Sequence, residues 1–407
     1  MKTPKRIAAF AILLATASAS SSFAQTDVFL VAKEFTQTMP DGVQIVMWGY
    51  ALDADGDLLT DDGEAASSPG PQIVVPPGEA LLRIHIRNDL PADTSLIIPG
   101  QTTTLSPVMF TDASGRERVS SFTTVVAPGA TATYTWNDVR NGSFMYQSGT
   151  HVAVQIQMGL FGSMTKEFEP GRAYRQPTPF HVGEASVFYS EIDPDLHAAV
   201  AGGTYGTPAY PNTLDYRPRY FLVNGEPFSA GVADISLGAV GESSLVRFFN
   251  AGLETHVPTA LGMDMLIVAE DGNLLPTNRS SYSVFLPAGK TKDVLIQPEM
   301  PGRHALVDRS MALSNNNGPD GGMLVFLSAD IPQELSEAQN KLDTWSKRVF
   351  KAKAKLTIAF AMPEATPAEQ RAKARAVETW RSRLETARSR LSRAMNRLVQ
   401  MQEDLDS

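Results

Sequence analysis

Imidazole and thiolate, the strong side-chain ligands for transition metals, are scarce in this sequence. The chain has 407 residues, with six histidines and no cysteine. Without cysteine it can form no disulfide and can offer no thiolate to a metal ion. Any metal site must therefore be built from other groups, such as imidazole and carboxylate. The sequence also lacks a Gly-x-Ser-x-Gly nucleophile motif, a phosphate-binding loop and a His-Glu-x-x-His motif.

One acidic segment has the spacing of a calcium-binding loop. Positions 1, 3, 5, 9 and 12 of the EF-hand pattern correspond to Asp53, Asp55, Asp57, Asp61 and Glu64. The glycine expected at position 6 is replaced by Leu58, and no helices are predicted on either side. Two interpretations follow: a calcium site, or an acidic, solvated hairpin loop in an all-β domain.

The start of the chain resembles a secretion signal. Lys2, Lys5 and Arg6 precede an apolar run from Ile7 to Ala17, and small residues occupy the positions before a predicted cleavage at Ala24–Gln25. This pattern predicts a signal peptide over 1–24 and export to the periplasm or beyond. No later segment contains 18 continuous apolar residues, so we expect no transmembrane helix in the mature chain.

Charge divides the mature chain into two parts. Residues 331–407 contain 15 Lys and Arg and 10 Asp and Glu, a net charge of +5, whereas residues 25–330 carry −17. An acidic body argues against nucleic acid as its partner. The basic tail is either an ordinary solvated helix surface or one that lies against an anionic partner.

Residues 25–165 and 166–330 each predict an all-β domain. In the first, Leu82, Ile84 and Ile86 alternate with polar residues, which is typical of a half-buried strand, and His85 falls on the polar side. Strand-like sequence also runs from Phe144 to Ile156. Regularly spaced short strands favour a sandwich, so the predicted fold is mainly β, with two tandem Greek-key sandwiches. Residues 166–218 are expected to form an irregular crossing segment.

Residues 331–407 predict an antiparallel helical hairpin. Apolar residues recur at alternating steps of three and four from Leu335 to Ala359 and again from Val377 to Leu405, the heptad spacing of a coiled coil. Between them, Thr366, Pro367 and Glu369 form a helix-start signature. The second helix is the longer, so part of its apolar seam is expected to remain unpaired. The hairpin either packs alone or mediates self-association or binding to a protein partner.

The body resembles the multicopper oxidase family, whose domains have the cupredoxin (plastocyanin-like) fold. The residues that carry the resemblance are Pro69–Glu79, Ile84–Pro91, Gly142–Tyr146, Gly159–Gly162, Arg247–Gly252 and Ile267–Gly272. Together they are similar to the first and middle domains of the family. The resemblance implies copper chemistry, but the usual last domain, which holds the type 1 copper, has no counterpart before the helices.

The copper-binding motifs of that family are mostly absent. Ile98–Gln101 stands where the resemblance places a His-Trp-His-Gly segment, and Tyr146–His151 stands where it places Tyr-His-x-His. Only His151 matches a ligand position. A type 1 centre needs a cysteine thiolate, which this chain lacks. The resemblance therefore leads to a cupredoxin protein that has lost its type 1 and trinuclear sites and has no catalytic residues, and that binds partners or acts as a scaffold.

The alternative is a copper-binding protein or a copper-dependent oxidoreductase with a residual mononuclear site. Two or three imidazoles with a carboxylate can hold copper, and the candidates are His151, His256 and His304. His181 and His197 fall in the crossing segment and receive no role.

Overall fold

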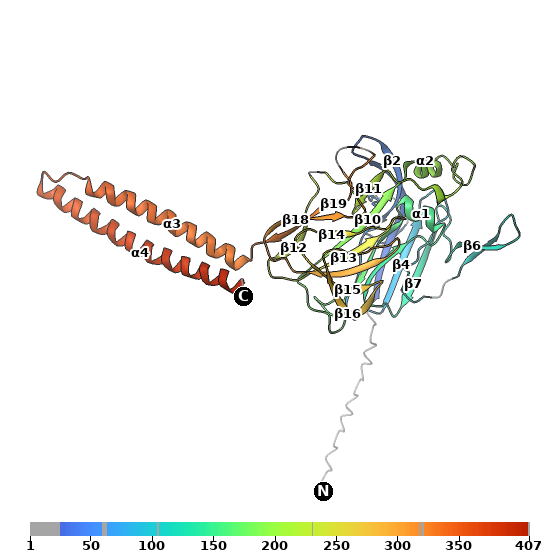
Figure 1. Ribbon diagram of the computed structural model, residues 1–407, viewed down its shortest axis with the longest axis horizontal. Coiled ribbons are helices and arrows are strands. Elements are labelled where there is room, and N and C mark those ends of the chain that lie inside the picture. Colours follow the sequence, from blue (N-terminus) through green and yellow to red (C-terminus); the bar gives the residue numbers. More distant parts are fainter. Residues whose placement is uncertain are drawn as a thin grey trace, which may run out of the picture.

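The computed structural model describes residues 25–58, 63–103, 106–229, 231–316, 318 and 321–405. They form two β-sandwiches in contact, from which a long helical hairpin projects (Figure 1). The predicted signal peptide over 1–24 lies outside the described residues. Within the described part of the chain, no helix is long and apolar enough to cross a membrane.

The first sandwich packs a four-stranded sheet, ordered β2-β1-β4-β7, against a three-stranded sheet, ordered β3-β9-β8. The predicted alternation in β4 is confirmed, since Leu82, Ile84 and Ile86 are buried and the residues between them are half-buried. The strands are β1 (Gln25–Thr38), β2 (Gln44–Leu52), β3 (Ile73–Val75), β4 (Leu81–Asn88), β7 (Thr131–Asn137), β8 (Gly142–Gln147) and β9 (Phe161–Lys166).

Two features of this sandwich differ from a plain strand pattern. Strands β5 (Val108–Thr111) and β6 (Glu117–Ser121) form a separate two-stranded sheet, an arm that leaves the body (Figure 1). The prediction that strand sequence continues to Ile156 is wrong, because α1 (Val152–Met158) follows β8. The left-handed backbone of His151, φ 42°, ends the extended chain, and tertiary burial of one helix face outweighs the strand propensity of the valines.

The second sandwich has a six-stranded sheet, ordered β11-β10-β13-β17-β15-β16, and a four-stranded sheet, ordered β12-β19-β18-β14. The crossing segment is more regular than predicted, since it includes α2 (Pro194–Ala201) and a 3-10 helix, η1 (Thr213–Asp215). The strands are β10 (Gly183–Ile192), β11 (Tyr220–Val223), β12 (Ile235–Ala239), β13 (Ser244–Asn250), β14 (Pro258–Ala260), β15 (Met265–Glu270), β16 (Asn273–Ser281), β17 (Thr291–Ile296), β18 (Gly302–Asp308) and β19 (Leu324–Asp330).

Both sandwiches contain the same buried hydrogen-bonding arrangement around an asparagine. Asn88 ends β4 and Asn250 ends β13, and each is fully buried. Each side-chain amide donates to the carbonyl four residues later and to a carbonyl of a facing segment, over 2.7 to 2.9 Å. Six residues after each asparagine, Thr94 and His256 form a bridge with that same facing segment. The two sandwiches are therefore built on the same plan.

The two sandwiches share a buried interface with a polar centre. Ser143 of β8 donates to Asp293 of β17 over 2.6 Å, and Arg247 of β13 donates to Ser143 over 2.8 Å. All three side chains are buried. Both sandwiches also contribute to one apolar cluster, which consists of Met145, Phe161, Phe188, Phe249 and Ala251.

The predicted helices are confirmed as α3 (Gln333–Phe360) and α4 (Pro367–Leu405). The seam alanines Ala338, Ala352 and Ala359 are buried between them. At the start of α4, the Glu369 amide donates to Thr366 Oγ1 and the Thr366 amide donates to Glu369 Oε2, at 3.2 and 2.9 Å. This reciprocal pair is the predicted capping box.

The pairing register shows where the extra length of α4 lies. The Arg390 guanidinium lies 4.8 Å from the Trp345 ring centre, and Arg397 lies beside the first turns of α3. The first turns of α4 therefore extend beyond the end of α3. There the linking residues fold back, since Gln370 donates to the Glu364 carbonyl over 3.0 Å and Lys373 pairs with the Glu364 carboxylate. The part of the α4 apolar seam that extends beyond α3 thus lies at the tip of the hairpin, against this linker.

Candidate functional site

The surviving family position, His151, lies at one end of the first sandwich. Strand β8 ends at Gln147, which pairs with Ile97 through two backbone hydrogen bonds of 2.9 Å. The chain then turns to His151, which has left-handed backbone angles and precedes α1. Its backbone amide donates to the Ser120 carbonyl over 3.2 Å, and its imidazole is exposed.

Below His151 lies a buried network of hydroxyl and amide groups. Gln155 of α1 accepts hydrogen bonds from Thr94 and Ser148, over 2.8 and 2.6 Å, and donates to the Asp93 carbonyl over 2.7 Å. The side chains of Thr94, Ser148 and Gln155 are at most 2% exposed. The amide of Gln155 therefore joins α1 to two loops of the sandwich.

A second set of hydroxyls extends this network. Ser95 lies 2.8 Å from the Thr150 hydroxyl and 3.1 Å from the Ser121 hydroxyl, and all three are buried. Neutral hydroxyl and amide groups are poor ligands for copper compared with imidazole and thiolate. Their mutual hydrogen bonds satisfy buried polar atoms and fix the loop below His151.

An open groove of about 240 Å³ lies next to His151. Its walls include Phe122, Val152 and Tyr205. It continues to the β5–β6 arm, whose apolar side chains Val108, Met109, Phe110 and Val119 are exposed together with Phe122. Contiguous exposed apolar side chains of this kind are typical of interaction surfaces.

His256 lies in the second sandwich, within a buried ion-pair network. Its Nδ1 is 2.9 Å from Asp308 Oδ2 and its Nε2 is 2.5 Å from Glu191 Oε1, and none of the three side chains is exposed. Burial alone would lower the pKa of His256. The hydrogen bonds to Asp308 and Glu191 outweigh that effect and raise the pKa to about 9. At neutral pH the ring is therefore doubly protonated, without a lone pair for a metal.

The other histidines also have protein partners. His304 Nε2 donates to the Met300 carbonyl over 2.9 Å, because a carbonyl oxygen can only accept. His85 stacks on Phe29 and contacts Asp27 and Thr133, consistent with its predicted place on the polar side of β4. His197 is buried, between the carbonyls of Val46 and Gln157.

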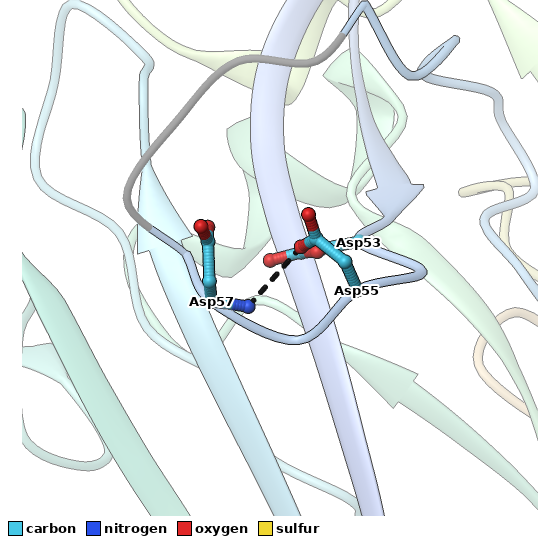
Figure 2. A group of neighbouring side chains, drawn as sticks. All are labelled: Asp53, Asp55 and Asp57. Atoms are coloured by element: carbon cyan, nitrogen blue, oxygen red, sulfur yellow. Dashed lines mark hydrogen bonds between the residues drawn. The ribbon is translucent and has the colours of Figure 1, made fainter.

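The acidic residues predicted as calcium ligands converge only in part. Asp53, Asp55 and Asp57 each place a carboxylate oxygen within 4.8 Å of the others (Figure 2). However, Asp53 accepts hydrogen bonds from the amides of Gly56 and Leu58, at 2.9 and 2.8 Å, as in an ordinary tight turn. Asp61 lies outside the described residues. Glu64 is described and half-buried.

The three copper candidates do not form one cluster. His151 belongs to the first sandwich, whereas His256 and His304 belong to the second and contact different partners. Among the described residues, the aspartate trio is the one group of three or more His, Asp or Glu with ligand atoms within 4.8 Å of one another. Sequence reasoning did not identify Gln155 and its hydroxyl partners, or Glu191 and Asp308.

Comparisons with known proteins agree with this fold. Residues 63–167 match the family model described as multicopper oxidase. The copper-containing nitrite reductase of Neisseria meningitidis serogroup B is 25% identical over 322 residues, which cover 77% of this chain and 72% of that protein. Among solved structures, the multicopper oxidase mgLAC superposes with a TM-score of 0.59 at 19% identity, covering 75% of this chain and 87% of the other. This chain is therefore similar to multicopper oxidases and copper nitrite reductases, and its body has the cupredoxin fold.

A second solved structure supports the same assignment of fold. The blue copper oxidase from Nitrosomonas europaea has a TM-score of 0.58 at 17% identity, and the match covers 76% of this chain and 89% of the other. The segment that matches the family model, residues 63–167, belongs to the first sandwich. Within it, Gln101 has a structural role, because it exchanges two hydrogen bonds with the Arg140 backbone, at 2.9 and 3.2 Å.

Proposed function

We propose that this multicopper oxidase-like protein is exported, has lost the type 1 and trinuclear copper sites, and acts as a binding or scaffolding protein. The absence of cysteine from all 407 residues carries this proposal. A type 1 centre takes electrons through a cysteine thiolate beside two imidazoles. Without that thiolate, this chain cannot form the type 1 centre that receives electrons in the family.

The remaining histidines support the same proposal. Of the first-domain positions that the family resemblance assigns to copper, only His151 carries an imidazole. His256 is held between two buried carboxylates and is protonated at neutral pH. The residues present therefore do not fit the family's copper set. The alternative, a single residual copper site, would have to use His151 with ligands from outside its sandwich.

Two surfaces support a binding role. The β5–β6 arm exposes Val108, Met109, Phe110 and Val119 next to the His151 groove. We propose that a protein partner covers this arm. The second surface is on the hairpin, where Met395 and Val399 of α4, one turn apart, are 52% and 49% exposed near the body. We propose that these two side chains mediate association.

Elemental analysis tests the loss of the copper sites. The mature chain, residues 25–407, is loaded with Cu²⁺, dialysed and analysed for bound copper and visible absorption. We expect retained copper well below one ion per chain and no thiolate charge-transfer band. Retention of about one copper per chain would refute the proposal, and His151→Ala and His256→Ala would then locate the ligands.

Sedimentation velocity tests the association role. The double variant Met395→Asp with Val399→Asp changes two exposed positions, so the α3–α4 seam stays intact. Leu398→Asp is a less selective test, because Leu398 is a half-buried residue of that seam. We expect the double variant to sediment as a smaller species than the wild type. Ser392→Asp, on an exposed position of the same helix, is the control. An unchanged sedimentation coefficient for the double variant would exclude this surface as the interface.

A further inference from the structure

The distal half of α3 has a second apolar face that α4 does not cover. Phe350 and Ile358 are 77% and 58% exposed, and Ala354 lies exposed between them. At 3.6 residues per turn, these positions lie on the side of the helix opposite Ala352 and Leu356, which face α4. This outer face of α3 is therefore apolar along two turns without any contact to its partner helix.

Lysines border this outer face on both sides. Lys347, Lys351 and Lys355 follow one flank and Lys353 lies on the other, and all four are exposed. Lys347 is 3.7 Å from Asp343, while within the described residues Lys351, Lys353 and Lys355 have no ion-pair partner. The result is a narrow apolar face with lysines on both flanks, three of which have no ion-pair partner among the described residues.

The tip of the hairpin is positive as a whole. Residues 344–385, which make up the distal part of α3, the linker and the start of α4, contain ten Lys and Arg and four Glu, a net charge of +6. The body has the opposite sign, with −17 over residues 25–330. Figure 1 shows that the hairpin carries this tip well away from the body. The positive charge is thus concentrated at the end of a projecting arm.

We propose that the outer face of α3 binds the surface of an anionic lipid bilayer. A helix with lysines beside an exposed strip of phenylalanine and isoleucine has the composition of an interfacial helix. The apolar side chains would enter the boundary between headgroups and acyl chains. The lysine stems would extend along the same boundary, with their ammonium groups at the lipid phosphates. This proposal is independent of copper binding and of the Met395–Val399 surface.

Charge favours lipid over a second copy of the same face. Two such faces in contact would oppose Lys351 and Lys355 of one chain to the same lysines of the other, and like charges in contact are unfavourable. An anionic bilayer instead offers negative charge across the whole face. It also repels the acidic body, so the hairpin is the part that approaches the surface.

Co-sedimentation with vesicles tests this proposal on the full mature chain. We expect binding to mixed phosphatidylglycerol–phosphatidylcholine vesicles, weak binding to phosphatidylcholine alone, and release at high salt. Lys351→Glu with Lys355→Glu, and separately Phe350→Ser with Ile358→Ser, should each lower the partition coefficient about tenfold or more. Circular dichroism should show unchanged helix content, because all four residues are exposed.

The matched control makes the same charge change elsewhere on the hairpin. Arg388→Glu with Arg393→Glu alters two exposed arginines of α4 closer to the body and should leave the partition coefficient within about twofold. Equal losses in both charge pairs, equal binding to neutral vesicles, or no vesicle binding would overturn the proposal. So would a change of oligomeric state in the Lys351 and Lys355 variant without lipid, which would show a contact between copies.

Discussion

Thr94 and His256 occupy the same position in the two sandwiches. Each lies six residues after the buried asparagine that ends a core strand, and each pairs with the segment facing that asparagine. Thr94 donates to Gln155 in a neutral network, whereas His256 joins Glu191 and Asp308 in an ionic one. The same place in the fold therefore holds a buried polar side chain in both sandwiches. Neither Thr94 nor His256 is exposed to solvent as His151 is.

Replacing His256 should destabilise the second sandwich strongly. His256→Ala removes the one positive group between two fully buried carboxylates. Loss of one partner from a buried ion pair costs about 3–5 kcal/mol. Urea unfolding at pH 7 measures this cost. The control, His304→Ala, changes a partly exposed ring with one backbone contact and should stay within about 0.5 kcal/mol of wild type. Equal effects of both variants would contradict a buried ionic role for His256.

The same network predicts how stability depends on pH. The pKa of His256 is raised from its ordinary 6.5 to about 9 in the folded chain. Its contribution is therefore fully present below pH 6.5 and is lost as pH rises through about 9, by up to about 3 kcal/mol. Thermal unfolding of the wild type from pH 6 to pH 10 should show this loss, and His256→Ala should not. A parallel decline in both proteins would assign the pH dependence to another group.

The local parts of the fold could be predicted from the sequence. Two patterns depend only on residues that are close in sequence: the alternation of Leu82, Ile84 and Ile86 in a strand, and the heptads of both helices. The capping box at Thr366 is equally local. By contrast, α1 was missed because its valine-rich sequence suits a strand, and only the left-handed His151 and the packing of α1 make it helical.

The candidate site was harder to predict because its partners are distant in sequence. His256 is 65 residues from Glu191 and 52 from Asp308, and no spacing rule connects them. Gln155 is 61 residues from Thr94. One signal in the sequence could have helped. The repeated spacing from Asn88 to Thr94 and from Asn250 to His256 shows that His256 has a core position and not an exposed one.

Replacing Gln155 should destabilise the first sandwich. Gln155→Leu leaves the buried hydroxyls of Thr94 and Ser148 without their shared acceptor. Each unsatisfied buried group costs about 1–3 kcal/mol, so the loss for the two groups should be about 2–6 kcal/mol of unfolding free energy in urea titrations. Gln297→Leu changes an exposed glutamine and should have little effect. A neutral result for Gln155→Leu would mean that the network does not hold the loop below His151.

The interface between the sandwiches should decide whether they unfold together. Ser143→Ala removes the hydroxyl that donates to Asp293 and accepts from Arg247. The loss of one buried partner from this group costs about 1–3 kcal/mol. We expect the wild-type sandwiches to unfold in one urea transition and the variant to unfold in two. Tryptophan fluorescence reports the first sandwich through Trp48 and Trp136, and near-ultraviolet circular dichroism adds the tyrosines of the second. Ser186→Ala, in β10, is the control. A single, unshifted transition in Ser143→Ala would show that the apolar cluster alone couples the sandwiches.

The hairpin offers a test of close helix packing with two neighbouring alanines. Ala352 is 4% exposed in the seam with α4, whereas Ala354 lies on the outer face. Ala352→Leu adds volume where the backbones approach and should cost about 1–3 kcal/mol. The melting temperature of the hairpin, followed by the helical signal in circular dichroism, should therefore fall. Ala354→Leu makes the same change on the exposed side and should leave the melting temperature unchanged. If both variants melt alike, the buried alanines do not set the distance between the helices.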